Sequence, residues 1–173
     1  MLGTQRQLSL WERRYDWPLI ILYLYFIFSC VAIERLYCFG SGPMDPNDNR
    51  FMMPETYDFS RKYNPLFLER PEWMRVATCF SAFGLLPFHV VLLVSFTFGI
   101  NSVRPVAFVF AGVKMYALLF YHYMQFHSPT PPPELIPYWL PEGPYLAVLA
   151  ASLYRMRKPQ PFAADLDTEK KTC

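Results

Sequence analysis

Long apolar runs alternate with short polar stretches along this chain. Residues 17–33 contain no charged side chain, and this first run stops at Glu34 and Arg35. A helix rises ~1.5 Å per residue and the hydrocarbon layer of a bilayer is ~30 Å thick, so runs of this kind predict transmembrane helices. Two further runs follow, one without any Asp, Glu, Lys or Arg and one with Lys114 as its single charge. The predicted spans are 17–38, 76–103 and 105–127.

A fourth, weaker apolar segment covers residues 134–154 and carries Pro137, Pro141, Glu142 and Pro144 in its first half. Proline removes a helical hydrogen bond, and lipid offers no replacement partner. We therefore interpret this segment as a proline-bent helix whose first turns are covered by its neighbours. The sequence then predicts an all-α membrane protein with four transmembrane helices in one bundle.

The connection between the first two spans is long and rich in large apolar side chains such as Phe51, Met52 and Phe67, although it also carries both signs of charge. A disordered segment would not hold so many of them. We expect short helices that lie on the membrane face and cap the bundle, with Pro65 and Pro71 starting helical stretches. The predicted domains are an N-terminal segment 1–16, a membrane domain 17–158 and a polar tail 159–173.

Basic residues cluster near the two chain ends and in the second connection, whereas the third connection has none. This distribution predicts that both ends face the cytosol. Lys170 and Lys171 stand third and fourth from the end, like the dilysine signal that returns membrane proteins to the endoplasmic reticulum. We therefore expect the protein to reside in the membrane of the endoplasmic reticulum, with the mitochondrial inner membrane as the alternative location. The basic residues concerned are Arg6, Arg13, Arg14, Arg104, Arg155, Arg157 and Lys158.

Composition excludes several classes of function. The net charge of +2 is too small to indicate a nucleic-acid partner. His122 and His127 are five residues apart and fall on different helix faces, so no metal site is expected. No nucleophile, phosphate or cofactor motif is present, and no catalytic residue or cofactor is predicted. The four scattered cysteines, Cys30, Cys38, Cys79 and Cys173, are expected to be buried packing thiols rather than disulfide partners.

Glu34 is the main candidate for function, because an acid in a spanning helix usually faces a cavity or a partner. It lies ~26 Å along its helix from Trp17, a level that His122 could share. We predict a ligand-binding cluster near the far membrane face. The alternative is that Glu34 and Arg35 simply mark the end of the span in water. The predicted ligand-binding residues are Glu34, Ser81, Tyr121, His122 and Tyr145.

Two other polar residues lie inside spans. Lys114 is ~14 Å from Pro105, nearer the middle of its helix, and that depth does not match Glu34. Its ammonium is expected to snorkel or to pair within the bundle. His89 is expected to be a hydrogen-bonded core histidine rather than a proton carrier.

Several local motifs stand out, and the most specific is Y-N-P-L-F-L-E-R-P-E-W, residues 63–73. The others are W-P-L-I-I-L-Y, L-L-P-F and G-P-Y-L within predicted spans and V-R-P-V-A at the start of the third span. Together, over nearly the whole chain, they resemble the EXPERA family, which includes the sigma-two receptor and emopamil-binding protein. The residues expected to be structural in or near these motifs are Asn64, Pro65, Trp73, Pro87, Arg104 and Pro144.

The resemblance implies a four-helix bundle of the endoplasmic reticulum, often dimeric, around a pocket for sterols or cationic amphiphiles that opens toward lipid. Glu34 falls at the position of the first-span acid of that pocket. Ser81 replaces the second acid and Asn64 replaces an aspartate of the connection. The histidine–glutamate arrangement of the sterol isomerases has no clear counterpart here.

We therefore expect a non-enzymatic protein that binds a sterol-like or amphiphilic lipid near Glu34. The alternative is a structural accessory subunit of a large membrane complex, for example in the mitochondrial inner membrane, built on the same scaffold. A sterol isomerase is the third possibility. The expected partners are a membrane lipid or sterol and either a second copy of the chain or a larger membrane complex, without nucleic acid.

Overall fold

The computed structural model describes residues 6–164, and the regular elements in this part of the chain are helices, apart from one isolated antiparallel bridge between Gln7 and Ala163. Two π-helical segments, η2 and η3, interrupt the α-helices, and single 3-10 turns precede α1 and α7. The elements are α1 (Trp17–Ser29), η2 (Cys30–Glu34), α2 (Arg35–Phe39), α3 (Met53–Tyr63), α4 (Pro65–Glu69), α5 (Glu72–Cys79), η3 (Phe80–Leu85), α6 (Leu86–Phe98), α7 (Arg104–Phe126) and α8 (Leu135–Arg155).

Three continuous helical rods are long and apolar enough to cross a membrane. They cover Arg14–Phe39, Glu72–Phe98 and Asn101–Phe126. This confirms an all-helical chain with several candidate spans. The fourth rod, α8, is 21 residues long but is not among these candidates, so its crossing stays a prediction.

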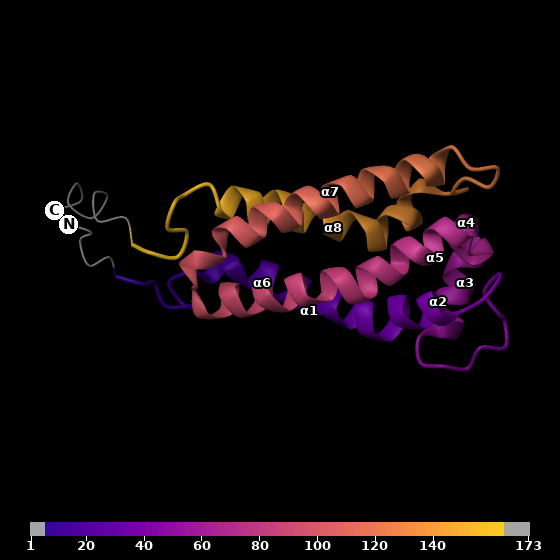
Figure 1. The fold of residues 1–173 in the computed structure, drawn as a ribbon, viewed down its shortest axis with the longest axis horizontal. Helices are drawn as coiled ribbons and strands as arrows, with labels where there is room; N and C mark the ends of the chain where they lie inside the picture. The colour runs from indigo at the N-terminus through magenta and orange to yellow at the C-terminus, as the bar shows by residue number, and fades with distance from the viewer. Residues whose placement is uncertain (1–5, 165–173) are drawn as a thin grey trace.

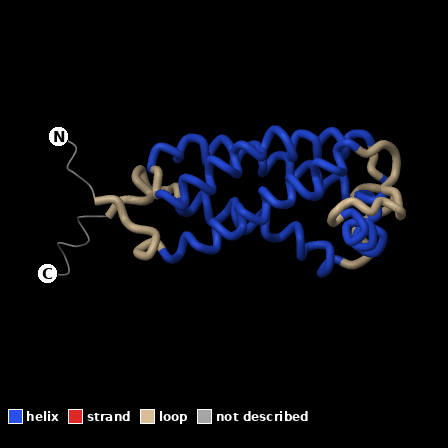
Figure 2. Tube along the Cα trace, turned by 90° about the horizontal axis from the view of Figure 1, so that it is seen from below, coloured by secondary structure: helices blue, strands red, loops and turns tan. Residues whose placement is uncertain are grey.

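The four rods form one elongated bundle (Figure 1). α1 packs against α6, α2 against α5, and α8 against both α7 and α1. The short helices α3 and α4 lie across one end of the bundle, and the described N- and C-terminal segments meet at the other end (Figure 2). The short helices predicted for the first connection are therefore present, and their location at a membrane face stays a prediction.

Local sequence explains where the second rod begins and ends. Pro71 stands immediately before α5 as its N-cap, and Gly99 ends α6 with a φ of 70°, a conformation that glycine adopts without strain. The rod covers Glu72–Phe98 rather than the predicted 76–103, since the helix starts directly after Pro71 and ends at Gly99, and its first turn holds an ion pair between Glu72 and Arg75 at 2.6 Å.

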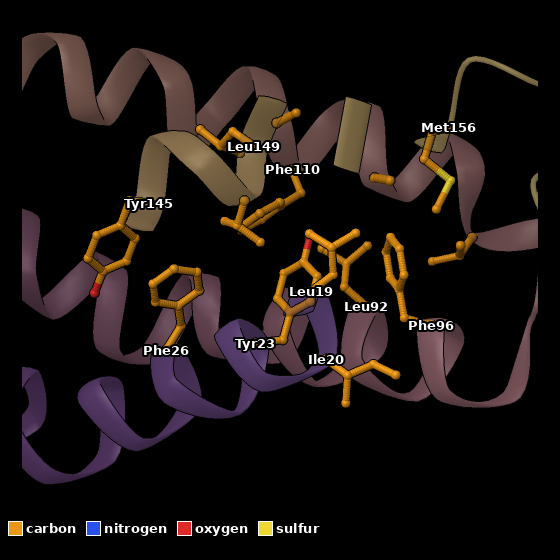
Figure 3. Packing of buried hydrophobic residues seen from close by; sticks show 14 of the residues in the cluster. Leu19, Ile20, Tyr23, Phe26, Leu92, Phe96, Phe110, Tyr145, Leu149 and Met156 are labelled. Carbon is orange, nitrogen blue, oxygen red and sulfur yellow. The ribbon is translucent and has the colours of Figure 1, made fainter. Parts of the chain in front are cut away.

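The core is apolar and aromatic along most of the bundle. Figure 3 shows Tyr145 against Phe26 at one end and Phe96 near Met156 at the other. The outward faces carry many exposed large apolar side chains, which suits contact with lipid.

A buried ion cluster closes the end where the termini meet. Asp16 is 1% exposed and accepts hydrogen bonds from Arg13 at 2.8 Å and from Arg155 at 2.7 Å. Arg13 also donates to the carbonyl oxygen of Phe96 at 2.8 Å. Both guanidinium groups lie over the ring of Phe162, so the N-terminal segment, α6, α8 and the C-terminal segment are joined here.

A disulfide joins Cys38 in α2 to Cys79 in α5, with 4.8 Å between their Cα atoms. The expectation of separate packing thiols was wrong for this pair, because the antiparallel packing of α2 on α5 brings together residues 41 positions apart. Cys30 is a free, buried thiol as expected, whereas Cys173 and the two lysines of the proposed retrieval signal lie outside the described residues.

We expect Asp16→Asn to lower the free energy of unfolding by about 3–5 kcal/mol, because it leaves the buried Arg13 and the partly buried Arg155 without their counter-ion. The matched control is Asp58→Asn, since Asp58 pairs with Arg61 at the same spacing but at an exposed site. Unfolding in detergent, followed by tryptophan fluorescence, measures both. Equal effects of the two variants would contradict the structural role of the cluster.

We expect alkylation of Cys38 and Cys79 in the denatured protein only after reduction, because both thiols are held in the disulfide. Peptide mass spectrometry of protein isolated from membranes with a blocking reagent present checks this. Cys30 serves as the internal control, since its free thiol must be modified without reductant once the chain is denatured. Labelling of all three without reductant would refute the bond.

Candidate functional site

A cavity of about 600 Å³ lies at the end of the bundle that α3 covers. Its walls come from α1, η2, α3 and the first half of α8, and it is mostly apolar with a few polar groups. This size is typical of small-molecule sites, which span ~300–1,000 Å³. The lining residues are Tyr25, Ser29, Ile33, Glu34, Met52, Glu55, Thr56, Phe59, Ser60, Asn64, Phe67, Leu140, Pro141, Glu142 and Tyr145.

A second, smaller cavity of about 130 Å³ adjoins the first. Four residues line both cavities: Glu34, Phe67, Glu142 and Tyr145. We call these four residues the shared wall. The smaller cavity is completed by residues of α5, η3 and α7, namely Met74, Ala77, Thr78, Ser81, Lys114, Ala117, Leu118 and Tyr121.

Two π-helical segments help to shape the site. Glu34 is the last residue of η2, where the backbone N–H of Arg35 bonds to the carbonyl oxygen of Cys30. Pro87 stands two residues after the end of η3 and cannot donate to the turn before it, which accounts for the wider winding there. π-Helical turns occur frequently at functional sites. Here η2 and η3 pack against each other beside the cavities.

The Glu34 carboxylate is directed into the bundle and is half-buried. Its Oε1 atom accepts a hydrogen bond from the Tyr145 hydroxyl at 3.3 Å and lies 3.5 Å from the Ser29 hydroxyl. The Tyr145 ring is held by stacking on Phe26, with 4.2 Å between ring centres. The sequence prediction of an inward-facing acid beside Tyr145 agrees with this geometry, while its ligand-binding role stays a prediction.

The structure adds two charged residues to this group. Glu142 is part of the shared wall, although in the sequence it is visible only as a charge that weakens the fourth span. Lys114 is 7% exposed, lines the smaller cavity with Glu34, and holds its Nζ atom 4.3 Å from the centre of the Tyr145 ring. The expected mismatch in depth between Lys114 and Glu34 was wrong, because that estimate assumed straight, parallel α-helices.

The other predicted site residues separate into two groups. Ser81 and Tyr121 line the smaller cavity, and the Ser81 hydroxyl has no hydrogen-bond partner within residues 6–164. His122 lines neither cavity. Its Nδ1 atom lies 2.8 Å from the Tyr138 hydroxyl on α8, so its expected place beside Glu34 is corrected. A shared depth does not fix the helix face on which a side chain lies.

The motif residues mostly position elements around the cavities. Asn64 caps α4 by accepting from the N–H of Phe67, and it donates to the Tyr121 hydroxyl at 2.9 Å. Pro65 follows as the first residue of α4, and Trp73 meets Phe120 edge to face.

At the opposite end of the bundle, Arg104 donates to the carbonyl oxygen of Met156 at 2.9 Å and so ties α7 to the end of α8. Pro144 lies inside α8, directly before Tyr145 of the shared wall.

His89 lies deeper than the cavities, with its Nδ1 atom 3.7 Å from the Cys30 thiol and its ring among Tyr23, Phe26 and Phe110.

The arrangement can hold a polar group within an apolar cavity. Carboxylate oxygens accept hydrogen bonds, and the buried Ser60 hydroxyl, which lines the larger cavity, has no partner among the described residues. Within residues 6–164, no group of three or more His, Cys, Asp or Glu side chains could hold a metal ion.

Comparison with known proteins adds no relative. No family model matches the chain, and neither the curated proteins nor the solved structures contain a match. The resemblance to the EXPERA family therefore stays a prediction from the motifs.

We expect Tyr145→Phe to lower the free energy of unfolding by about 1 kcal/mol, because it removes the hydroxyl beside Glu34 but keeps the ring on Phe26. Tyr145→Ala removes the ring as well and is expected to cost about 3–5 kcal/mol. Unfolding in detergent measures both variants. Tyr23→Phe is the control, since it removes a buried hydroxyl, bonded to Ser152 at 2.8 Å, outside the cavities. Equal losses for Phe and Ala at position 145 would show that stacking on Phe26 contributes nothing.

Proposed function

We propose that this protein is a non-enzymatic, multi-pass membrane protein that binds a sterol-like or amphiphilic lipid in the larger cavity. The apolar body of the lipid lies against Tyr25, Ile33 and Leu140, and its polar group meets Glu34. The single observation that carries this proposal is a cavity of about 600 Å³ with the Glu34 carboxylate in its wall.

The chemistry of the lining supports a lipid rather than a water-soluble metabolite. The cavity lies beside two rods, α1 and α8, whose outer faces are apolar, so a ligand can enter from the bilayer. The surface of the cavity is mostly apolar, and polar side chains such as Glu34 and Glu142 in its wall can fix the orientation of an otherwise apolar ligand. Lipid binding requires no proton transfer, whereas isomerisation of a sterol requires a donor and an acceptor positioned on one substrate.

The cavity also favours binding over a purely structural role. An accessory subunit that used the bundle only as a scaffold would be expected to fill the space between its helices with side chains, since protein interiors are close-packed. Its partner would be a larger membrane complex, whereas the binding function is compatible with a single copy or a homodimer.

We propose that α8 is the fourth span and that the protein resides in the endoplasmic reticulum with both ends in the cytosol. The disulfide supports this orientation, because Cys38 and Cys79 lie at the α3 end of the bundle, opposite the basic chain ends. Disulfides persist in oxidising compartments such as the lumen of the endoplasmic reticulum. The mitochondrial inner membrane is the alternative location.

Binding of tritiated cholesterol to the full-length protein in phosphatidylcholine nanodiscs tests the proposal. We expect saturable binding that Glu34→Gln weakens about tenfold, because the amide replaces a charged acceptor by a neutral one. Ser29→Phe is expected to abolish binding by filling the cavity beside Glu34.

Glu134→Gln is the matched control, since Glu134 is exposed and lies outside both cavities. It must bind like the unaltered protein. Absence of saturable binding, or equal binding by the Ser29→Phe variant, would refute the proposal. Co-purification with a stable complex in mild detergent would then support the accessory subunit.

A further inference from the structure

We propose that the smaller cavity is a second subsite of the lipid site, and that it receives a polar end with several hydroxyl groups, such as the glycerol end of a monoacylglycerol. This inference rests on the proposed lipid-binding function and names the class of ligand. The apolar chain of the lipid stays in the larger cavity. Glu34 and Glu142 then lie between the two parts of the ligand, since both residues line both cavities.

The two cavities meet at the shared wall. Its carboxylates come from different elements, because Glu34 ends η2 and Glu142 lies in the first half of α8. Its two aromatic side chains, Tyr145 and Phe67, are each held by stacking on a neighbouring ring, with 4.2 Å and 4.0 Å between ring centres. A lipid whose polar group meets Glu34 in the larger cavity therefore already lies at the border of the smaller one.

The smaller cavity contains two donors that the described part of the chain leaves without an acceptor. The Ser81 hydroxyl is buried and has no hydrogen-bond partner within residues 6–164. Lys114 is 7% exposed, and its ammonium lies 4.3 Å from the centre of the Tyr145 ring but donates to no oxygen in the same range of residues. A buried donor without an acceptor is costly, so whatever occupies this cavity is stabilised by supplying acceptors.

The volume of the smaller cavity exceeds what one hydroxyl group would fill. It measures about 130 Å³, which corresponds to roughly four water molecules at ~30 Å³ each. A ligand that enters such a polar space binds well only if it reproduces the hydrogen bonds that water would make there. A glycerol end meets this condition, because each of its hydroxyl groups donates and accepts as water does.

The charged groups around the smaller cavity also favour a neutral polyol over an anion. A phosphate end would offer acceptors to Lys114 and Ser81, but it would bring further negative charge beside Glu34 and Glu142. Hydroxyl groups serve both sides at once, because their oxygens accept from Lys114 and Ser81 while their hydrogens are donated to the carboxylates.

Displacement of tritiated cholesterol from the full-length protein in phosphatidylcholine nanodiscs tests this inference. The competitors share one monounsaturated chain and differ in the polar end: 1-oleoylglycerol, oleyl alcohol and the phosphate monoester of 1-oleoylglycerol. We expect 1-oleoylglycerol to displace cholesterol about tenfold more strongly than oleyl alcohol, because it adds hydrogen bonds in the smaller cavity. It should also displace cholesterol more strongly than its phosphate monoester.

Variants of the smaller cavity separate its contribution from that of the larger one. Ala117→Leu fills the space from α7 without removing a polar group, and should weaken 1-oleoylglycerol about tenfold while leaving oleyl alcohol unchanged. Ser81→Ala removes one donor and should weaken 1-oleoylglycerol alone, by about threefold. The matched controls are Ala150→Leu and Ser102→Ala, at exposed positions outside both cavities, and both should behave like the unaltered protein.

Equal displacement by 1-oleoylglycerol and oleyl alcohol would overturn the subsite while the lipid-binding function stands. So would equal losses for these two lipids in Ala117→Leu, and stronger displacement by the phosphate monoester would overturn the neutral polyol as its occupant. If Ala117→Leu does not fold, Ser81→Ala decides, and an unchanged ratio of the two affinities overturns the subsite. Failure of tritiated cholesterol to bind saturably would instead refute the proposed function itself.

Discussion

The free-energy cost of placing charge inside a low-dielectric bundle governs both ends of this molecule. At the terminal end, Asp16 is enclosed by Arg13 and Arg155, and Arg13 also donates to the carbonyl oxygen of Phe96, so the buried carboxylate is paired and hydrogen-bonded within the protein. At the α3 end, the carboxylates of the shared wall line two cavities instead. The ion cluster at the terminal end is therefore structural, whereas the carboxylates at the α3 end can interact with a ligand.

The apolar core between these two ends closes the larger cavity on its inner side. Tyr23, Phe96, Leu149 and other buried side chains fill the space between the rods from the His89 level to Met156 (Figure 3). The carboxylates of the shared wall lie at the α3 end, where both cavities described above are found. A ligand that enters beside α1 and α8 meets the shared wall and goes no further than these two cavities, which suits a binding site rather than a passage.

Features that depend on local sequence could be predicted. The long apolar runs, the starts at Pro65 and Pro71 and the amphipathic first connection follow from composition and from proline chemistry. Features that depend on how helices pack could not. The Cys38–Cys79 bond, the approach of Lys114 to the Tyr145 ring and the contact of His122 with Tyr138 of α8 each depend on how two rods are rotated relative to one another, which the local sequence does not specify.

α8 shows why the weakest predicted span forms part of the site. Pro141 and Pro144 cannot donate to the carbonyl oxygens of Pro137 and Leu140, so two acceptors are freed in the same turns that carry Glu142. Lipid cannot satisfy such groups, and a helix with these features is stable in a membrane only where protein or a polar cavity borders it. The sequence properties that lower the hydropathy of α8 are thus the ones that disfavour its contact with lipid, and Leu140 and Glu142 both line the larger cavity instead.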